Sequence, residues 1–298
     1  MAGVFADLEE IVSENVPLAR YTWYKIGGPA RYFIRPRSIE QLQAAARRCV
    51  ENDIPIYVLG LGANLLVRDE GVNGAVFRLS DEFWRRIRFE KNTLVAGAGV
   101  DMQKLILRAT RQSLGGLEVL AGIPGTIGGG VRMNAGGKFG DIGSLVTRVT
   151  VMDVSGMVFE RTRDDLVFDY RKTNITAKFI LDATLELEED DPQRIAMRLR
   201  DIWTMKRNSQ PLNTRSAGCI FKNPRGMSAG ALIDQTGLKG TRVGLAEVSE
   251  KHANFVIARP GCTAADVLAL IDLIRQRVQE KHGVWLEQEV EIWPPTPF

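Results

Sequence analysis

The segment SAGCIFKNP, residues 216–224, places three side chains that can do chemistry close together. The thiol of Cys219 is followed by the ammonium of Lys222 and the carboxamide of Asn223. A thiol with a pKa of about 8.5 stays mostly protonated at pH 7 and can still donate a proton, and a lysine acts as a point charge. By pattern alone, a single cysteine is more often a small buried apolar residue, and Lys222 and Asn223 also fit a solvated turn.

Arg171 and Glu289 are two further side chains that can act on an anion or a proton. Arg171 lies in DYRKT, residues 169–173, and its planar fork of donors suits a carboxylate. Glu289 lies in LEQEVEI, residues 286–292, where strand alternation puts apolar residues on one face and three glutamates on the other. By pattern alone, Arg171 fits a surface arginine at a strand end, and three carboxylates on one face indicate a solvated face.

Two glycine-rich segments are typical of loops that hold an anion. GLGANLLV, residues 60–67, follows a predicted strand, and LAGIPGTIGGGVRMNAGG, residues 120–137, contains seven glycines in 18 residues. Backbone N–H groups in such loops can point at a phosphate without a Cβ in the way. Neither segment contains a Walker A motif or fits the dinucleotide fingerprint well. Two such loops favour a large dinucleotide, although the first alone also fits an ordinary tight turn.

These side chains must be positioned by a mixture of helices and strands. The residue patterns predict helices over 38–54, 101–116, 190–211, 227–237 and 263–283, strands over 54–62 and 284–293, and an antiparallel meander over 146–188. We expect Ser38, Asp101 and Thr263 to be N-cap residues. We expect Gly115-Gly116 and Gly283 to end their helices. The fold class is α+β, with a domain boundary near residue 205.

The remaining cysteines and the histidines argue against a metal or disulfide protein. The chain has three cysteines and two histidines, and no two cysteines form a CxxC pair. An odd cysteine count without paired spacing suggests neither a disulfide framework nor a zinc knuckle, so we expect no metal. We take Cys49 and Cys262 as small buried apolar residues.

Composition and charge exclude several classes of protein. The 298 residues are 45% hydrophobic and 25% charged, and the formal net charge is only +3. This balance lacks the concentrated basic charge of a nucleic-acid binder. The N-terminal residues do not resemble a signal peptide, and no apolar run reaches 18 residues. We therefore expect a cytoplasmic protein that binds neither nucleic acid nor membrane. Because no exposed hydrophobic heptad is visible, we expect a monomer.

Read together, seven segments resemble the UDP-N-acetylenolpyruvoylglucosamine reductase (UDP-N-acetylmuramate dehydrogenase) family. They lie in order along nearly the whole chain, and they are YKIGGPARYF (24–33), GLGANLLV (60–67), AGIPGTIGGGVRMNAG (121–136), YRKT (170–173), SAGCIFKNP (216–224), VSEKHANFVI (248–257) and LEQEVEI (286–292). The chain looks too short for the extra tyrosine-bearing loop of part of the family, so it resembles the compact subclass.

The resemblance implies a fold and two cofactors. It implies a two-lobed FAD-binding domain of the vanillyl-alcohol-oxidase (PCMH) type at 1–204, with lobes of about 1–80 and 81–204, followed by a smaller α+β substrate domain at 205–298. It implies non-covalent FAD, NADPH as electron source, and a nucleotide sugar as substrate. The implied FAD contacts are Gly60, Leu61, Gly62, Ala63, Asn64, Leu65, Gly122, Ile123, Pro124, Gly125, Gly128, Gly129 and Asn134.

The implied reaction assigns roles to the side chains quoted first. Hydride passes from NADPH to FAD, and then from the flavin N5 to the vinyl carbon of an enolpyruvyl ether, completing UDP-N-acetylmuramate for peptidoglycan precursors. The adjacent carbon then needs a proton, for which Cys219 is the expected donor, and the added charge needs stabilisation, for which Arg171 is expected. Glu289 matches the family's glutamate beside the substrate carboxylate. Tyr170, Lys222 and Asn223 are the expected substrate contacts.

Three departures from the family pattern are visible. Ala63 stands where a serine is common, which removes one hydroxyl from the first glycine loop. Arg259 stands where an asparagine is common. The first glycine loop also lacks the histidine through which some relatives by fold attach flavin covalently. Arg215 and Lys206 are further candidates for phosphate contacts, and His252 is expected to have a structural role or to lie near the uridine.

Two other functions fit parts of the sequence. A flavin oxidase of the same fold, acting on a hydroxy acid with oxygen, would be reoxidised rapidly by O₂ and would not consume NADPH. A non-catalytic module that binds FAD or a nucleotide sugar would need no proton donor. The joint occurrence of Cys219, Arg171 and Glu289 argues against the module.

Overall fold

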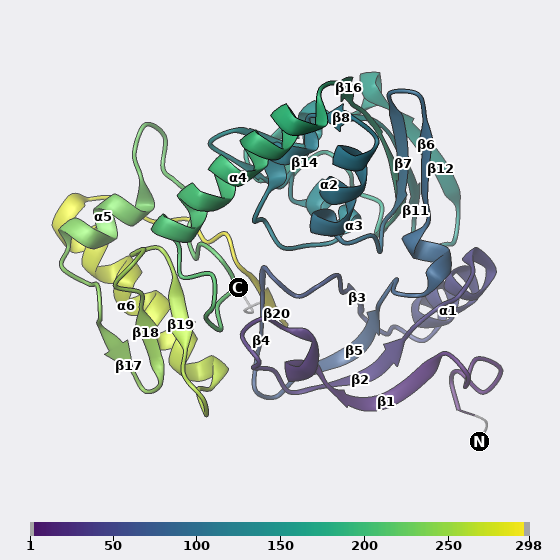
Figure 1. The fold of residues 1–298 in the computed structure, drawn as a ribbon. Coiled ribbons are helices and arrows are strands. Elements are labelled where there is room, and N and C mark those ends of the chain that lie inside the picture. The colour runs from purple at the N-terminus through teal and green to yellow at the C-terminus, as the bar shows by residue number, and fades with distance from the viewer. Residues whose placement is uncertain (1–2, 295–298) are drawn as a thin grey trace. The chain divides into compact units, whose positions relative to one another are not determined.

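Residues 3–294 are described by a computed structural model, in which the chain forms two compact units (Figure 1). The first unit consists of the chain up to Asn15, Arg31–Leu61 and Asn73–Met205. The second consists of Val16–Ala30, Gly62–Val72 and the chain from Lys206 onward. The two early segments belong to the second unit because their side chains Tyr24, Ile26 and Leu66 are buried in its core. The first unit has a separate hydrophobic core.

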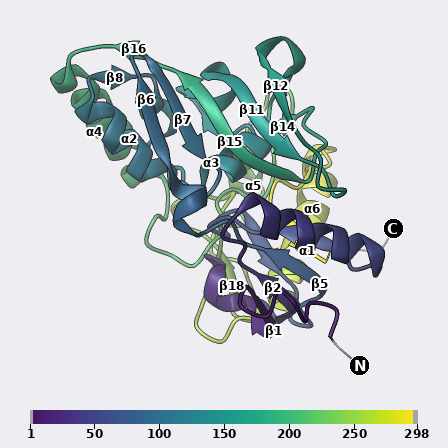
Figure 2. The same cartoon turned by 90° about the vertical axis from the view of Figure 1, so that its right-hand side faces the viewer.

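A five-stranded antiparallel sheet dominates the first unit (Figure 2). Its strands in spatial order are β12 (Val158–Thr162), β11 (Val146–Met152), β15 (Phe179–Glu186), β7 (Thr93–Gly97) and β6 (Ile87–Glu90). The predicted turn at Ser155-Gly156 joins β11 to β12, and Gly156 has φ +89°. The predicted meander is wrong in its order, because β15 pairs with β11 and β7. Since β15 is buried at most positions on both faces, it lies in the middle of the sheet.

The first unit also contains most residues of a smaller sheet, three helices and several short paired segments. The smaller sheet has the order β1 (Val12–Pro17), β2 (Pro29–Ile34), β5 (Val72–Phe77) and β3 (Ile56–Val58). The helices are α1 (Ile39–Glu51), α2 (Met102–Arg111) and α3 (Ile127–Arg132), and α4 (Pro192–Ser209) leads out of the unit. The short pairs are β8 (Leu114–Gly115) with β16 (Glu188–Glu189), β9 (Gly136–Gly137) with β10 (Gly140–Asp141), and β13 (Phe168–Asp169) with β14 (Lys172–Thr173).

Helix α2 begins where the sequence predicts and ends earlier. The Asp101 carboxylate accepts a hydrogen bond from the Lys104 N–H at 3.0 Å, as expected for an N-cap. The predicted end at Gly115-Gly116 is wrong, because Ser113 adopts φ +60° and Leu114–Gly115 then pairs with Glu188–Glu189. Pairing with a distant strand therefore overrides the local helical pattern.

The second unit is built around helix α6 (Ala264–His282). Thr263 and Asp266 form a reciprocal capping box at its start, and Gly283 closes it with φ +69°, both as predicted. Helix α5 (Ala229–Gln235) and the sheet β17 (Arg242–Val243), β18 (Ala246–Val248) and β19 (Val256–Ala258) complete the unit with the parallel pair β4 (Leu65–Val67) and β20 (Glu291–Trp293).

The predicted strand over 284–293 is mostly irregular. Only Glu291–Trp293 is a strand, and the preceding residues make single backbone contacts such as the Phe221↔Gln288 bridge. The predicted alternation holds in part, since Leu286 and Val290 are buried and Glu287 is exposed. Glu289 is half-buried and therefore differs from its acidic neighbours.

Asp69 connects the early segment of the second unit to α6. Its two carboxylate oxygens accept hydrogen bonds from the N–H groups of Ala264 and Ala265, at 2.9 and 3.1 Å. These are otherwise unpaired donors of the first helical turn, and a carboxylate there also interacts favourably with the helix dipole.

Replacing Asp69 should therefore lower the stability of the protein. We expect Asp69→Ala to reduce the free energy of unfolding by about 1–2 kcal/mol, measured by urea denaturation. Glu70→Ala, at the neighbouring exposed position, is the matched control and should change it by less than about 0.5 kcal/mol. Equal losses in the two variants would contradict the capping role.

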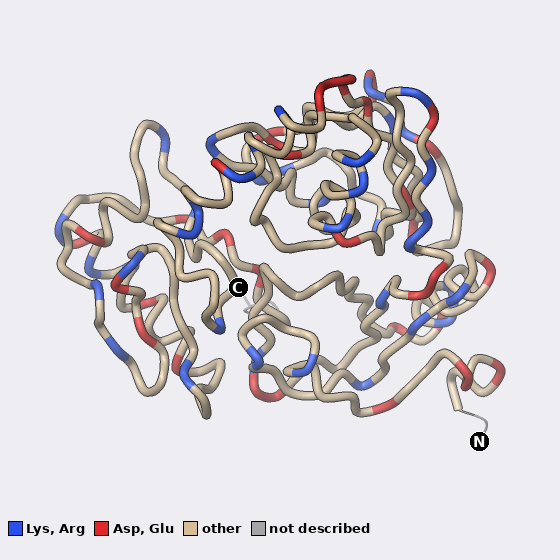
Figure 3. The backbone as a smooth tube through the Cα atoms, in the orientation of Figure 1, with Lys and Arg blue, Asp and Glu red and all other residues tan. Residues whose placement is uncertain are grey.

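Charges are distributed over both units. Figure 3 shows Lys and Arg interspersed with Asp and Glu along the chain, in agreement with the small net charge. Within residues 3–294, no helix is both long and apolar enough to span a membrane. The same residues contain no group of three or more His, Cys, Asp or Glu side chains that could hold a metal ion.

Candidate active site

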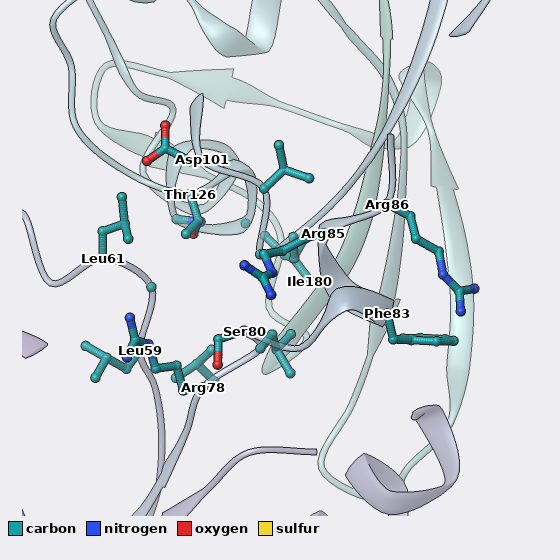
Figure 4. A pocket seen from close by; sticks show the side chains of 18 of the residues that line it. Leu59, Leu61, Arg78, Ser80, Phe83, Arg85, Arg86, Asp101, Thr126 and Ile180 are labelled. Atoms are coloured by element: carbon teal, nitrogen blue, oxygen red, sulfur yellow. The ribbon is translucent and has the colours of Figure 1, made fainter. Parts of the chain in front are cut away.

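The first unit contains a cavity of about 810 Å³ (Figure 4). It is lined by the end of β3 and the residues after it, the segments that follow β5 and β7, and parts of α2, α3 and β15. This volume lies within the usual range of small-molecule and cofactor sites, roughly 300–1,000 Å³. The cavity is therefore the main candidate for a ligand site in the first unit.

The cavity is strongly basic. Its lining includes seven basic side chains and two acidic ones, and the basic ones are Arg78, Arg85, Arg86, Lys104, Arg108, Arg132 and Lys178. Figure 4 shows Arg85 extending into the space near Ser80 and Thr126, whereas the Arg86 guanidinium lies 4.2 Å from the centre of the Phe83 ring. Burial lowers the pKa of Arg132, and partial burial and the nearby Arg132 charge lower that of Lys178. Such a lining suits an anion such as a diphosphate.

Two glycines bring backbone to the cavity wall without a side chain. A Cβ at Gly60 would lie 2.8 Å from Thr126 Oγ1, and a Cβ at Gly128 would lie 2.9 Å from the Ala98 Cβ. The Gly128 N–H donates to the Ala98 carbonyl at 2.9 Å, which fixes this approach. Because there is no room for a Cβ at either position, the two glycines set the shape of the cavity.

The predicted cofactor residues are divided among several places. Gly60, Leu61, Gly128 and Gly129 line the cavity. The rest of the first loop, Gly62 to Leu65, belongs to the second unit. Gly122, Ile123, Pro124 and Gly125 are not among the lining residues, and the Gly122 N–H donates to Gln103 Oε1 at 3.0 Å. Sequence reasoning missed the basic lining, although Lys104 and Arg108 lie four residues apart on one helix face.

Tyr170 and Arg171 form the two-residue loop of the β13–β14 hairpin. The pairs Phe168↔Thr173 and Asp169↔Lys172 flank the loop, and Arg171 adopts φ +56°. Residues other than glycine rarely adopt this left-handed backbone conformation, and those that do are often found at functional sites. The Arg171 guanidinium lies 5.0 Å from the centre of the Tyr170 ring, so the two side chains support each other.

Asn134 holds this hairpin in place. Its carboxamide donates to the Asp169 carbonyl at 3.0 Å and accepts from the Gly143 N–H at 3.0 Å. The side chain is buried, and the residue has φ +42°. The residue expected to contact FAD therefore fixes, in this structure, the backbone immediately before Tyr170 and Arg171.

In the second unit, the segment that carries Cys219 lies between two other segments. Cys219 forms a backbone bridge with Phe255 on one side, and Phe221 forms one with Gln288 on the other. The Glu289 N–H donates to the Ile220 carbonyl at 2.8 Å. The backbones that carry Cys219 and Glu289 are thus hydrogen-bonded neighbours, although the two residues are 70 positions apart. Cys219 itself is partly exposed.

Asn64 joins the same cluster. Its side-chain amide donates to the Glu289 carbonyl at 3.2 Å, and its own carbonyl accepts from the Glu291 N–H at 3.2 Å. Asn64 immediately precedes β4, whose parallel pairing with β20 sets this register. The first glycine loop therefore supports the glutamate that the sequence identifies as functional.

Lys222 and Asn223 lie at the end of the Cys219 segment. The Lys222 ammonium forms an ion pair with the Glu287 carboxylate at 2.5 Å, and the backbone N–H of Lys222 donates to the Glu287 carbonyl at 2.8 Å. Asn223 Oδ1 accepts from the Ala229 N–H at 3.0 Å, near the start of α5. Both side chains thus have structural contacts, and their expected substrate contacts stay predictions.

Comparison with known proteins decides the family. Residues 210–293 match the C-terminal domain of UDP-N-acetylenolpyruvoylglucosamine reductase, and residues 30–161 match an FAD binding domain. The chain is 42% identical to UDP-N-acetylenolpyruvoylglucosamine reductase 2 of Symbiobacterium thermophilum, over 95% of this chain and 92% of that one. It is 43% identical to the reductase of Moorella thermoacetica, over 95% and 93%. The chain belongs to the UDP-N-acetylenolpyruvoylglucosamine reductase family.

A solved structure supports the same conclusion. The UDP-N-acetylenolpyruvylglucosamine reductase of Thermus caldophilus is 39% identical, with a TM-score of 0.82, and the match covers 94% of this chain and 98% of that chain. The predicted family, the α+β class with an FAD-binding domain and the enzyme class of flavin-dependent reductase are thereby confirmed. The cavity agrees with FAD as cofactor, because its basic lining suits a diphosphate.

Arg259, one of the departures from the family pattern, pairs with a carboxylate. Its guanidinium contacts Glu247 Oε2 at 2.5 and 2.8 Å, and Arg242 contacts the same oxygen at 2.9 Å. Burial opposes ionisation of Glu247, but these hydrogen bonds and charges hold its pKa below the usual value. Nothing in the structure explains Ala63, and the roles of Arg215 and Lys206 stay predictions.

His252 has the structural contacts expected of it. Its Nδ1 accepts from the Asn254 N–H at 3.2 Å, and its ring packs edge-on against Phe255. Burial lowers the pKa of His252 below its ordinary value of about 6.5. A histidine of this kind binds a proton more readily in the unfolded state, so stability is lost as the pH falls below about 6.5.

The lowered pKa of His252 makes the stability of the protein depend on pH. The urea midpoint of the reductase should fall between pH 7.5 and pH 5.5, and the fall should be smaller in His252→Gln. His282→Gln removes the other imidazole and is the matched control. Parallel pH dependences for the wild type and His252→Gln would show that the imidazole at 252 does not contribute.

The other two thiols differ from an ordinary cysteine. Cys49 is fully buried in the core of the first unit, and burial raises its pKa to about 12. Cys262 is only partly buried, so the prediction of a buried residue is wrong at this position; it packs against the core of the second unit from its edge. Partial burial and the nearby Asp266 carboxylate raise its pKa to about 11. Both thiols are therefore poorly placed to give up a proton near pH 7.

Proposed function

We propose that this chain reduces the enolpyruvyl ether of UDP-N-acetylglucosamine enolpyruvate to UDP-N-acetylmuramate, for peptidoglycan precursor synthesis, with NADPH as electron source. The family assignment supports the substrate class. The observation that supports this site is the hydrogen bond from the Glu289 N–H to the Ile220 carbonyl, because it brings the backbones that carry Cys219 and Glu289 together. A binding module has no need for a proton donor and a carboxylate held in one cluster.

The proposed mechanism assigns one task to each of three side chains. Bound FAD, once reduced by NADPH, would supply the hydride for the vinyl carbon and would return to its oxidised form. The Cys219 thiol then donates its proton to the adjacent carbon, and the thiolate is reprotonated from solvent. Arg171, in its strained hairpin loop, stabilises the negative charge that builds up beside the carboxylate. Glu289 helps to orient the substrate carboxylate, and its proximity to that anion requires it to be protonated.

The first unit is proposed to hold FAD through its cavity. Gly60, Leu61, Gly128 and Gly129 would form the wall closest to the cofactor, and the basic side chains would meet its diphosphate. Substrate binding is proposed for the 205–298 part of the chain, with Tyr170, Lys222 and Asn223 as contacts. The segments Val16–Ala30 and Gly62–Val72 fold with that part.

The close approach at Gly60 predicts a defect in FAD binding. Gly60→Ala places a methyl group 2.8 Å from Thr126 Oγ1, so the cavity wall must shift. Such overpacking typically costs about 1–3 kcal/mol, which corresponds to about 5- to 150-fold weaker FAD binding. Titration of the apoprotein with FAD, followed by flavin fluorescence, measures it. Gly137→Ala, where nothing lies within 4 Å of the added Cβ, is the matched control and should bind FAD like the wild type.

Stepwise anaerobic reduction tests the proposed function. NADPH should bleach the yellow protein, and the enolpyruvyl nucleotide sugar should restore the flavin absorbance with formation of the lactyl ether. Rapid reoxidation by O₂ without NADPH consumption would instead identify a flavin oxidase. We also propose a cytoplasmic location, because the substrate and the reductant are free nucleotides, and a monomeric state, which sedimentation tests.

A further inference from the structure

Asn254, in the segment VSEKHANFVI, has an unusual set of contacts for a residue outside the proposed catalytic set. Its side chain is buried, with 3% of the residue surface exposed. The carboxamide Oδ1 accepts from the Phe221 N–H at 3.0 Å, and Nδ2 donates to the Phe221 carbonyl at 2.7 Å. The Asn254 backbone carbonyl also accepts from the Ile220 N–H at 2.9 Å.

These bonds fix the segment that carries Cys219. A primary amide presents a donor and an acceptor side by side, so the Asn254 side chain substitutes for the peptide of a neighbouring strand. The backbone bridge Cys219↔Phe255 is isolated. The Asn254 backbone carbonyl continues the pairing at Ile220, and the carboxamide continues it at Phe221. Because the site is buried, water cannot replace these bonds when they are lost.

Asn254 is itself held by a local turn. Its N–H donates to His252 Nδ1, and the His252 N–H donates to Ser249 Oγ at 3.3 Å. The Ser249 N–H in turn donates to the Phe255 carbonyl at 2.8 Å. The turn from 249 to 255 therefore presents the carboxamide in a single orientation.

We propose that Asn254 is a positioning residue for proton transfer, which holds the 219–221 backbone so that the Cys219 thiol meets the substrate carbon. The proposal rests on the proposed role of Cys219. A displacement of about 1 Å at a reacting group can cost on the order of 10²-fold in rate. Asn254 is thus expected to affect the substrate half-reaction and to leave reduction by NADPH unchanged.

Asn254→Asp is the sharpest test, because the variant keeps the size of the side chain. An ionised carboxylate still accepts from the Phe221 N–H, but it opposes the Phe221 carbonyl with a second acceptor. A protonated carboxyl group restores the donor, and burial favours that form. The variant should therefore be defective at pH 8 and recover as the pH falls. The titratable groups on the segments 216–224, 248–257 and 286–292 are Cys219, Lys222, Glu250, Lys251, His252, Glu287, Glu289 and Glu291. The wild-type pH profile corrects for them.

Two measurements on the purified FAD-loaded enzyme test the proposal. In stopped flow at pH 8, flavin reoxidation by substrate should slow by about 10²-fold in Asn254→Asp, with reduction by NADPH within about twofold of wild type, and the defect should shrink at pH 6. Mass-spectrometric alkylation of Asn254→Asp should show Cys219 reacting about tenfold faster at pH 8 than in the wild type, because the 219–221 segment opens more often. Cys262 in the same molecule is the internal control.

The outcomes are distinguishable. Asp69→Ala controls for stability, since it loosens the same unit without contact to the Cys219 segment. An equal rise in alkylation of Cys219 and Cys262, or the same kinetic defect in Asp69→Ala, would show a general loosening and overturn the proposal, as would unaltered reoxidation. If Cys219→Ala is reoxidised normally, the proposed proton donor is wrong. A selective, pH-reversible change in Cys219 alkylation would still establish the positioning contact.

Discussion

Cys219→Ala should lose substrate-dependent reoxidation of the flavin while keeping reduction by NADPH. Cys219 is partly exposed, and its backbone is hydrogen-bonded next to the segment of Glu289. Burial raises the pKa of Cys49, and partial burial with the Asp266 carboxylate raises that of Cys262. Removal of a general acid typically costs on the order of 10²- to 10⁴-fold in rate. Anaerobic stopped-flow absorbance of the flavin separates the two half-reactions.

Two variants make this result specific. Cys219→Ser keeps a hydroxyl donor at the same place and should retain a substantial part of the activity. Cys262→Ala removes a thiol of the same unit and should leave both half-reactions unchanged. Normal reoxidation of Cys219→Ala by substrate would refute the role of the thiol.

Arg171→Gly should also abolish most of the substrate half-reaction. Loss of one group that stabilises developing negative charge typically costs on the order of 10²- to 10³-fold. Glycine is chosen because Arg171 has φ +56°, a conformation that glycine adopts without strain. The β13–β14 hairpin should therefore stay folded, and the free energy of unfolding should be equal to or slightly above that of the wild type.

Measuring both the rate and the stability of Arg171→Gly distinguishes a catalytic role of the guanidinium from a role in folding. A loss of rate with unchanged urea stability would assign the effect to the guanidinium. Lys172→Ala, in the next position, removes an exposed cation of the same hairpin and is the matched control. If Lys172→Ala lost as much activity as Arg171→Gly, the requirement would be for positive charge in the hairpin and not for the guanidinium at 171.

The sequence predicts best what depends on neighbouring residues. The caps at Asp101 and Thr263 and the turn at Gly156 rest on hydrogen bonds or dihedrals within a few positions, and all three are confirmed. The end of α2 was wrong because Leu114–Gly115 pairs with a strand more than 70 residues away. Local patterns carry no information about such a partner.

The same distinction applies to the candidate site. Motif resemblance identified Cys219, Arg171 and Glu289 individually, but not the contacts that hold them. Asn134 and Asn254 fix the segments of Arg171 and Cys219 through backbone groups, which any sequence supplies. The basic cavity lining was also missed, because its residues come from several elements and form no motif.

The path of the chain has a consequence for how this enzyme can be dissected. The chain passes between the two units five times, at residues 15/16, 30/31, 61/62, 72/73 and 205/206. A recombinant fragment starting at Lys206 would lack Tyr24, Ile26 and Leu66 and would expose the apolar surface that they cover. Genetic truncation near residue 205 is therefore expected to give an insoluble product, and a separately expressed C-terminal half would need the early segments supplied in trans.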